Sequence, residues 1–180
     1  LPRSRGLGDV YKRQEGELFS DFKPKTKEVI FDLGKKVGLL DLYSKRCKKT
    51  LRIPGNKWNL TKPYWIENHL SDIKDSKIRK ILIDILDDFK NISNFLQNLE
   101  SQWTHNDLND QNLLVNYNGV NLPEISGILD FGDLSFCPRI CNIAICSAYL
   151  LILPDVGMEK QLHFLKGYHL KNPVSENELD

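Results

Sequence analysis

Residues 104–133 constrain the fold more than any other part of this 180-residue chain. The segment contains two sets of polar residues separated by two apolar runs. The first set is His105 and Asp107 with Asn112 five residues after the Asp, and the second is Asp130 within Leu-Asp-Phe-Gly-Asp. The sequence thus places amide and carboxylate side chains directly before and directly after a pair of candidate strands.

The two apolar runs, residues 113–116 and 125–129, have the length of short strands, and the pair Asn118-Gly119 between them is typical of a turn. We therefore predict a β-hairpin that brings Asn112 and Asp130 to the same end of the two strands. The alternative is an ordinary hairpin in which Asp and Asn serve only as turn formers. The joint occurrence of both polar sets in this order and spacing favours a catalytic role.

This order and spacing are those of a phosphoryl-transfer catalytic loop followed by its metal-binding loop. Such chemistry holds an alcohol in line with the γ-phosphorus and neutralises the triphosphate with Mg²⁺. Asp107 is the predicted base for the hydroxyl proton. Asn112 and Asp130 are the predicted Mg²⁺ ligands, because Mg²⁺ prefers oxygen ligands and takes few of them from the protein. His105 is assigned to the catalytic loop, where we expect it to hold the backbone by hydrogen bonds rather than to exchange protons with substrate.

Three further polar residues of the segment have two interpretations each. Asn109 and Asp110 either shape the turn or reach the substrate. Asp133 either forms a turn or contacts a second metal ion or a cationic acceptor. All three are therefore candidate substrate or metal contacts.

At these residues the chain resembles the aminoglycoside phosphotransferase and choline kinase group of small-molecule kinases. Protein kinases usually carry Arg between the His and the Asp and Ala-Pro-Glu after the metal loop, and neither is present here. Within the group, residues 107–112 followed by 126–133 are similar to the members that phosphorylate 5-hydroxylysine. The resemblance extends over residues 20–175, and its specific motifs lie in residues 104–133.

The resemblance implies an α+β fold, namely the mostly helical C-terminal lobe of a protein-kinase-like fold with a short catalytic β-hairpin. It also implies Mg²⁺, GTP or ATP as phosphate donor, and a small-molecule alcohol as acceptor, in the first place the hydroxyl of 5-hydroxy-L-lysine. The motif specifies phosphoryl transfer but not the acceptor. An aminoglycoside, choline or homoserine is thus an alternative acceptor, and a catalytically inactive kinase-like binding module is an alternative function.

Two positions depart from the pattern of the group. The residue between the His and the Asp is usually Gly and is Asn106 here; Asn tolerates a left-handed backbone better than most residues. The helix after the metal loop often carries an acid before its Ile-Ala pair, and this chain has Asn142 there. We therefore expect one structural anchor of the catalytic loop to differ from that of the group.

Apolar residues at helical spacing predict helices around this segment. The predicted helices span residues 24–40, 62–70, 77–99, 140–153 and 158–170, with a further helix start at Ser175. The clearest is residues 77–99, capped by Asp75-Ser76, in which the apolar face from Ile78 to Leu99 is predicted to be buried. Trp58 is expected to pack against the helix that follows it, with a place in the wall of the acceptor pocket as the alternative.

The ends of the chain suggest a fragment. Residues 1–14 lack apolar periodicity and an initiator Met, so we interpret them as an adaptor or cloning scar. Residues 15–180 contain neither a Gly-rich phosphate loop nor a strand like Val-Ala-Ile-Lys, and we interpret them as a C-terminal lobe without its N-lobe. We therefore expect a truncated C-terminus and no activity from this chain alone.

Composition narrows the other function classes. A formal net charge of +1 gives no electrostatic footprint for nucleic acid or an anionic membrane, and no apolar run has the length of a membrane span. The four cysteines form no C-x-x-C pair, which argues against zinc and favours buried reduced thiols. We therefore expect a cytoplasmic enzyme whose partners are a nucleotide and a small alcohol; nothing in the sequence indicates its oligomeric state.

Overall fold

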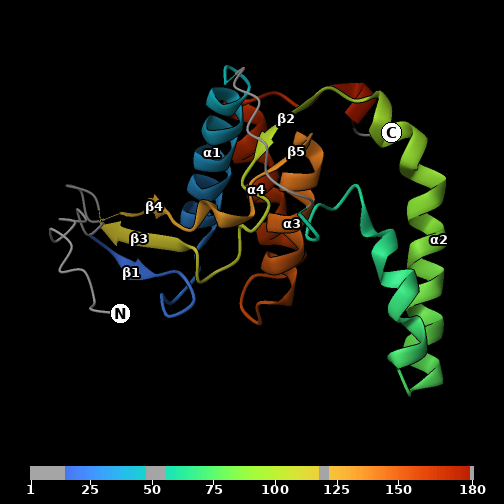
Figure 1. The fold of residues 1–180 in the computed structure, drawn as a ribbon. Helices are drawn as coiled ribbons and strands as arrows, with labels where there is room; N and C mark the ends of the chain where they lie inside the picture. Colours follow the sequence, from blue (N-terminus) through green and yellow to red (C-terminus); the bar gives the residue numbers. More distant parts are fainter. Residues whose placement is uncertain (1–14, 48–55, 118–121, 179–180) are drawn as a thin grey trace, which may run out of the picture.

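The computed structural model describes residues 15–47, 56–117 and 122–178. The predicted adaptor at residues 1–14 and the predicted turn at Asn118-Gly119 lie outside the described residues. In the described part of the chain the fold is α+β, as predicted, with helices on one side of a small sheet (Figure 1).

The strands form two separate antiparallel groups. A three-stranded sheet has the order β1 (Glu17–Leu18), β3 (Leu113–Tyr117), β4 (Pro123–Ile128). The second group pairs β2 (Ser101–Thr104) with β5 (Ser135–Pro138). The helices are α1 (Lys27–Ser44), α2 (Ser76–Asn98), α3 (Arg139–Ile152) and α4 (Gly157–Lys171), with 3₁₀ helices η1 (Pro63–Asp72), η2 (Phe131–Asp133) and η3 (Glu176–Glu178).

The predicted hairpin is confirmed by the pairing of β3 with β4, in which Leu113 lies opposite Ile128. Directly beyond this pair, the Leu129 N–H donates to the Asn112 carbonyl at 2.8 Å. Asn112 therefore lies beside the residue that precedes Asp130, as the hairpin requires.

The β2–β5 pair, which was not predicted from the sequence, joins the start of the catalytic loop to the end of the metal loop. The catalytic loop runs from β2 to β3, and the metal loop runs from β4 to β5. β2, before the catalytic loop, pairs with β5, after the metal loop. β3, after the catalytic loop, pairs with β4, before the metal loop. Both ends of each loop are therefore joined to the other loop through paired strands. Backbone hydrogen bonds between the strands therefore fix the ends of the two loops relative to each other.

The core lies where α1 and α4 pack on each other and α1 packs on the sheet. Val29, Ile30 and Leu33 of α1 are fully buried, as are Phe164 and Tyr168 of α4. The helices approach closely through glycines, since a Cβ at Gly34 would lie 2.0 Å from the Phe164 carbonyl oxygen. Through α1, this packed pair of helices contacts β2 and β4, the strands that precede the catalytic and metal loops.

The helix predicted at residues 77–99 forms as α2, with Asp75 accepting from the Lys77 and Ile78 N–H groups as its N-cap. The predicted burial of its apolar face is wrong. Leu86 is the one buried residue of α2, whereas Ile78, Ile81 and Ile85 are 51%, 56% and 45% exposed. The helix packs on η1, and Figure 1 places this pair on the side of the molecule opposite the three-stranded sheet. Helical periodicity predicts that a helix has an apolar face, but that face is buried only where another element packs on it. Here η1 covers only part of the apolar face of α2.

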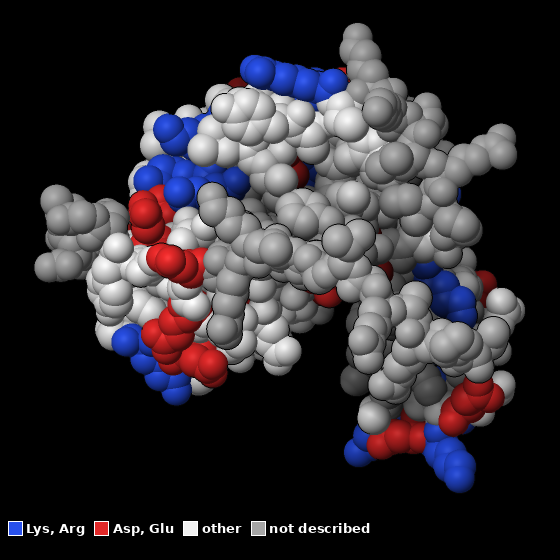
Figure 2. Space-filling view, turned by 60° about the vertical axis from the view of Figure 1, so that its left-hand side comes forward, with Lys and Arg blue, Asp and Glu red and all other residues white. Residues whose placement is uncertain are grey.

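Three of the four cysteines, Cys137, Cys141 and Cys146, are buried free thiols as expected, but Cys47 is exposed just after α1. None of the helices in the described part of the chain is long and apolar enough to cross a membrane. On the face shown in Figure 2, basic and acidic side chains occur in small groups of either sign.

Candidate active site

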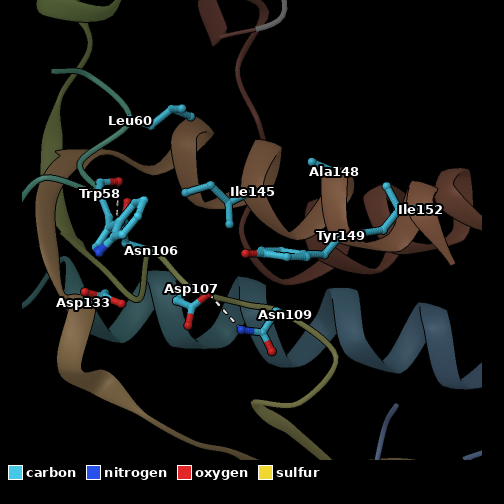
Figure 3. Close-up of a pocket in the computed structure, with 10 residues that line it drawn as sticks. All are labelled: Trp58, Leu60, Asn106, Asp107, Asn109, Asp133, Ile145, Ala148, Tyr149 and Ile152. Atoms are coloured by element: carbon cyan, nitrogen blue, oxygen red, sulfur yellow. Dashed lines mark hydrogen bonds between the residues drawn. The ribbon is translucent and has the colours of Figure 1, made fainter. Parts of the chain in front are cut away.

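Amide donors hold both carboxylate oxygens of Asp107, the predicted base. Asn109 Nδ2 donates to Asp107 Oδ1 at 2.9 Å, and Asn112 Nδ2 donates to Asp107 Oδ2 at 2.8 Å and to the Asp107 carbonyl at 2.9 Å (Figure 3 shows the first of these). Each carboxylate oxygen can accept a further hydrogen bond. The half-buried carboxylate is therefore fixed in orientation and still able to receive a hydroxyl proton.

Asn109 also shapes the loop, because its Oδ1 accepts from the N–H groups of Gln111 and Asn112 at 2.8 and 3.1 Å. Asn109 thus forms the turn, one of the two interpretations left open for it, and its side chain also lines the pocket described below, so its contact with substrate stays a prediction. Asp110 behaves differently. Its carbonyl accepts from the Ser20 N–H at 3.0 Å, and its side chain does not line the pocket described below.

The predicted metal ligands present oxygen atoms suited to Mg²⁺. The donations of Asn112 Nδ2 to Asp107 leave Asn112 Oδ1 as the amide atom that a cation would use. Asp130 is exposed in a left-handed conformation with φ of 55°, and its Oδ1 accepts from the Gly132 N–H at 3.1 Å. No three His, Cys, Asp or Glu side chains of the described residues group as a metal site. A Mg²⁺ ion here would therefore depend on Asn112, Asp130 and nucleotide phosphates, a ligand set that Mg²⁺ commonly takes.

His105 bridges the catalytic and metal loops. The Asp107 N–H donates to His105 Nδ1 at 3.2 Å, so Nε2 carries the proton and donates to the Leu129 carbonyl at 2.7 Å. The ring also packs on Phe131, with centroids 4.6 Å apart. Burial lowers the pKa of His105, which keeps this tautomer neutral. These are the backbone hydrogen bonds expected of His105.

Asn106 adopts the left-handed conformation anticipated for it, with φ of 67°. Its N–H donates to Asn142 Oδ1 at 3.1 Å, and Asn142 Nδ2 donates to Asp41 Oδ1 at 2.8 Å. Asp41, on α1, is fully buried and also accepts from the Tyr168 hydroxyl at 2.8 Å. Burial raises the pKa of Asp41 to about 7. The loop anchor is therefore an amide on α3 with a carboxyl group behind it on α1.

A pocket of about 680 Å³ lies over the catalytic loop. Asp107, Asn109 and Asp133 line it, so the structure brings together three of the predicted site residues, while Asp130 and Asp110 lie outside the lining. In Figure 3, Trp58 and Asn106 lie on one side of the pocket, and Tyr149 and Ile152 on the other. The lining residues are Trp58, Leu60, Asn106, Asp107, Asn109, Asp133, Ile145, Ala148, Tyr149 and Ile152.

Sequence reasoning missed the apolar wall of the pocket and two polar residues, Tyr149 on that wall and Asp41 behind the catalytic loop. Tyr149 faces the pocket, and burial together with the nearby negative charge of Asp107 raises the pKa of its hydroxyl. The spacing of Ile145, Tyr149 and Ile152 on one helical face could have indicated this wall. Asp41 was also missed, although an acid on the apolar face of a helix, four residues after Val37, is a recognisable signal of a buried polar role.

The chain matches known proteins over most of its length. The model of the family described as "Phosphotransferase enzyme family" matches residues 8–169. Hydroxylysine kinase of Xenopus laevis is 28% identical over 171 residues, covering 86% of this chain and 44% of that protein. Hydroxylysine kinase of Mus musculus is 29% identical over 123 residues, covering 66% of this chain and 33% of that protein. The chain thus spans less than half the length of these curated relatives.

Two solved structures share the fold. The crystal structure of aminoglycoside-3'-phosphotransferase of type VIII has a TM-score of 0.61 at 18% identity, covering 92% of this chain and 62% of that one. A GDP complex of an aminoglycoside 2'-phosphotransferase of type IIIa has a TM-score of 0.58 at 15% identity, covering 93% of this chain and 55% of that one. The predicted kinase-like fold class is confirmed by these neighbours.

Proposed function

The chain belongs to the phosphotransferase enzyme family, and from this membership we propose that it carries the catalytic lobe of a Mg²⁺-dependent kinase for a small-molecule alcohol. The proposed acceptor is the hydroxyl of 5-hydroxy-L-lysine, and the proposed donor is GTP or ATP. The observation that carries the proposal is the Asp107 carboxylate, held by two amides at the floor of a pocket, with Asn112 and the metal loop directly beside it.

In the proposed reaction, Asp107 accepts a hydrogen bond from the acceptor hydroxyl and directs its oxygen toward the γ-phosphorus. Asn109 and Asn112 keep the carboxylate from rotating away, which supplies positioning. Asn112 Oδ1 and Asp130 are the proposed ligands of Mg²⁺, which when bound neutralises charge on the phosphates. His105 stays neutral and holds the two loops together rather than exchanging protons with substrate.

The pocket supports an acceptor that carries an amine. Asp107 and Asp133 contribute two carboxylates to the lining, and Trp58 and Tyr149 contribute aromatic rings. Carboxylates attract a cation, and aromatic faces bind it further. 5-Hydroxylysine has this chemistry, and the relatives named hydroxylysine kinase support the same acceptor. For the donor, the GDP complex of a structural neighbour supports a guanine nucleotide.

The test is phosphate transfer by the full-length protein from Mg-GTP and from Mg-ATP to 5-hydroxylysine. We expect turnover that Asp107→Asn lowers by roughly 10²- to 10⁴-fold, the usual contribution of a positioned base. Asp88→Asn is the matched control, because it makes the same chemical change at an exposed carboxylate of α2, outside the pocket lining. Unfolding temperatures of both variants show whether folding is preserved.

Three outcomes are informative. Full activity of Asp107→Asn would reject Asp107 as the base. Turnover only with an aminoglycoside, choline or homoserine would keep the kinase and change its acceptor. Absence of turnover with every alcohol and both nucleotides would favour an inactive binding module.

A further inference from the structure

One wall of the pocket comes from residues 56–61, here called the Trp58 segment. It precedes η1 and consists of turns, without a helix or strand of its own. Trp58 is 66% exposed, and its ring meets Trp65 edge to face with centroids 6.3 Å apart. The position of this wall therefore depends on a few specific contacts.

Two side-chain amides tie the Trp58 segment to the catalytic and metal loops. Asn106 Nδ2, from the catalytic loop, donates to the Trp58 carbonyl at 3.0 Å (Figure 3). Asn56 Nδ2, from the segment itself, donates to the Asp133 carbonyl at 2.8 Å and to Ser135 Oγ at 3.0 Å. The wall is thus hydrogen-bonded to both loops that carry the proposed chemistry.

Asn106 is held more firmly than a surface residue would be. It is 5% exposed, and its own N–H is bound to Asn142, which in turn is bound to the buried Asp41. A continuous series of hydrogen bonds therefore runs from α1 through α3 and the catalytic loop to the Trp58 carbonyl. A glycine at residue 106 could adopt the same left-handed backbone but would have no side chain to reach Trp58.

We propose that Asn106 is a positioning residue that sets the distance between the Trp58 wall and Asp107, and thereby determines which acceptors the pocket takes. This inference rests on the proposed function. Trp58 lies across the pocket from Tyr149, so a shift of the Trp58 segment changes the space in which the amine-bearing part of the acceptor lies (Figure 3). Asp107 is the next residue after Asn106, which makes the wall and the proposed base parts of one hydrogen-bonded unit.

The first measurement is hydrogen–deuterium exchange of the Trp58 segment in the full-length protein without ligands. Asn106→Gly removes the donor and keeps a residue that favours the left-handed backbone, so the loop can retain its fold. Asn177→Gly, at an exposed residue of η3, is the matched control. We expect faster exchange in residues 56–61 for Asn106→Gly only. Unchanged exchange would overturn the inference whether or not the protein is active.

The second measurement separates the acceptor from the nucleotide. Losing one neutral hydrogen bond should raise the KM for the acceptor by roughly three- to tenfold, with smaller changes in kcat and in the nucleotide KM. A lower unfolding temperature with an unchanged acceptor KM would assign Asn106 a merely structural role. Absence of turnover in the unmutated protein would reject the proposed function, while the exchange result would still decide whether Asn106 holds the wall.

Discussion

The buried Asp41 predicts a specific pH dependence of stability. Burial raises its pKa from 3.8 to about 7, against the lowering effect of the Tyr168 and Asn142 hydrogen bonds. Between these two values the folded chain retains a proton that the unfolded chain has lost. The Asp41 contribution to stability is therefore present at low pH and is lost as the pH rises toward 7. From pH 5 to pH 8 this contribution falls by roughly 2.5 kcal/mol, at about 1.36 kcal/mol per pKa unit.

Asp41→Asn isolates this effect, because it removes the titration and keeps an oxygen that can accept from Asn142 Nδ2. The assay is urea unfolding of both proteins at pH 5 and at pH 8. Relative to the unmutated protein, the variant should gain roughly 2.5 kcal/mol between the two pH values. Changes in packing or in the Tyr168 hydrogen bond occur at both pH values and cancel in this double difference. Asp84→Asn, at an exposed carboxylate of α2, should give a double difference near zero. An equally small value for Asp41→Asn would refute the reasoning.

Three further substitutions test the helix packing. Gly167→Ala should lower the free energy of unfolding by about 1–3 kcal/mol or more, because the added Cβ would lie 2.0 Å from the Phe31 carbonyl oxygen. The assay is thermal or urea unfolding, and Lys166→Ala, at the exposed neighbouring residue, is the control. Ile81→Lys should change stability by less than about 0.5 kcal/mol, since Ile81 is 56% exposed, whereas Leu86→Ala should cost about 2–5 kcal/mol. Equal losses for Ile81→Lys and Leu86→Ala would show that the apolar face of α2 is covered in solution.

The catalytic hairpin could be predicted because the pattern that specifies it lies within one short stretch of sequence. Two strand-length apolar runs flanked by Asn112 and Asp130 leave few arrangements, and β3 and β4 form at nearly the predicted positions. The β2–β5 pair could not be predicted in the same way. Each strand has four residues, too few for an alternating pattern to stand out, and each is specified by its partner more than 30 residues away.

Burial was the least predictable property. The pattern of α2 is strongly amphipathic, yet Ile81 and Ile85 are largely exposed, because periodicity within a helix does not specify what packs on it. The reverse occurs at Asp41, an acid that is fully buried. In both cases the decisive information lies in another element: η1 for α2, and α3 and α4 for Asp41.

The hydrogen bond between Asp41 and Asn142 accounts for the residue type at each of the two positions. Asn142 must accept from the Asn106 N–H on one side and meet Asp41 on the other, and an amide is able to accept and donate at once. A carboxyl group at residue 142 could accept from the Asn106 N–H, but it would place a second acidic group against Asp41 in a buried site, where each disfavours ionisation of the other. Conversely, an apolar residue at position 41 would leave the buried Asn142 Nδ2 without an acceptor. This chain therefore has an amide at residue 142 and an acid at residue 41 on α1. The catalytic loop is anchored by the two residues together, and neither could be replaced alone without losing a hydrogen bond.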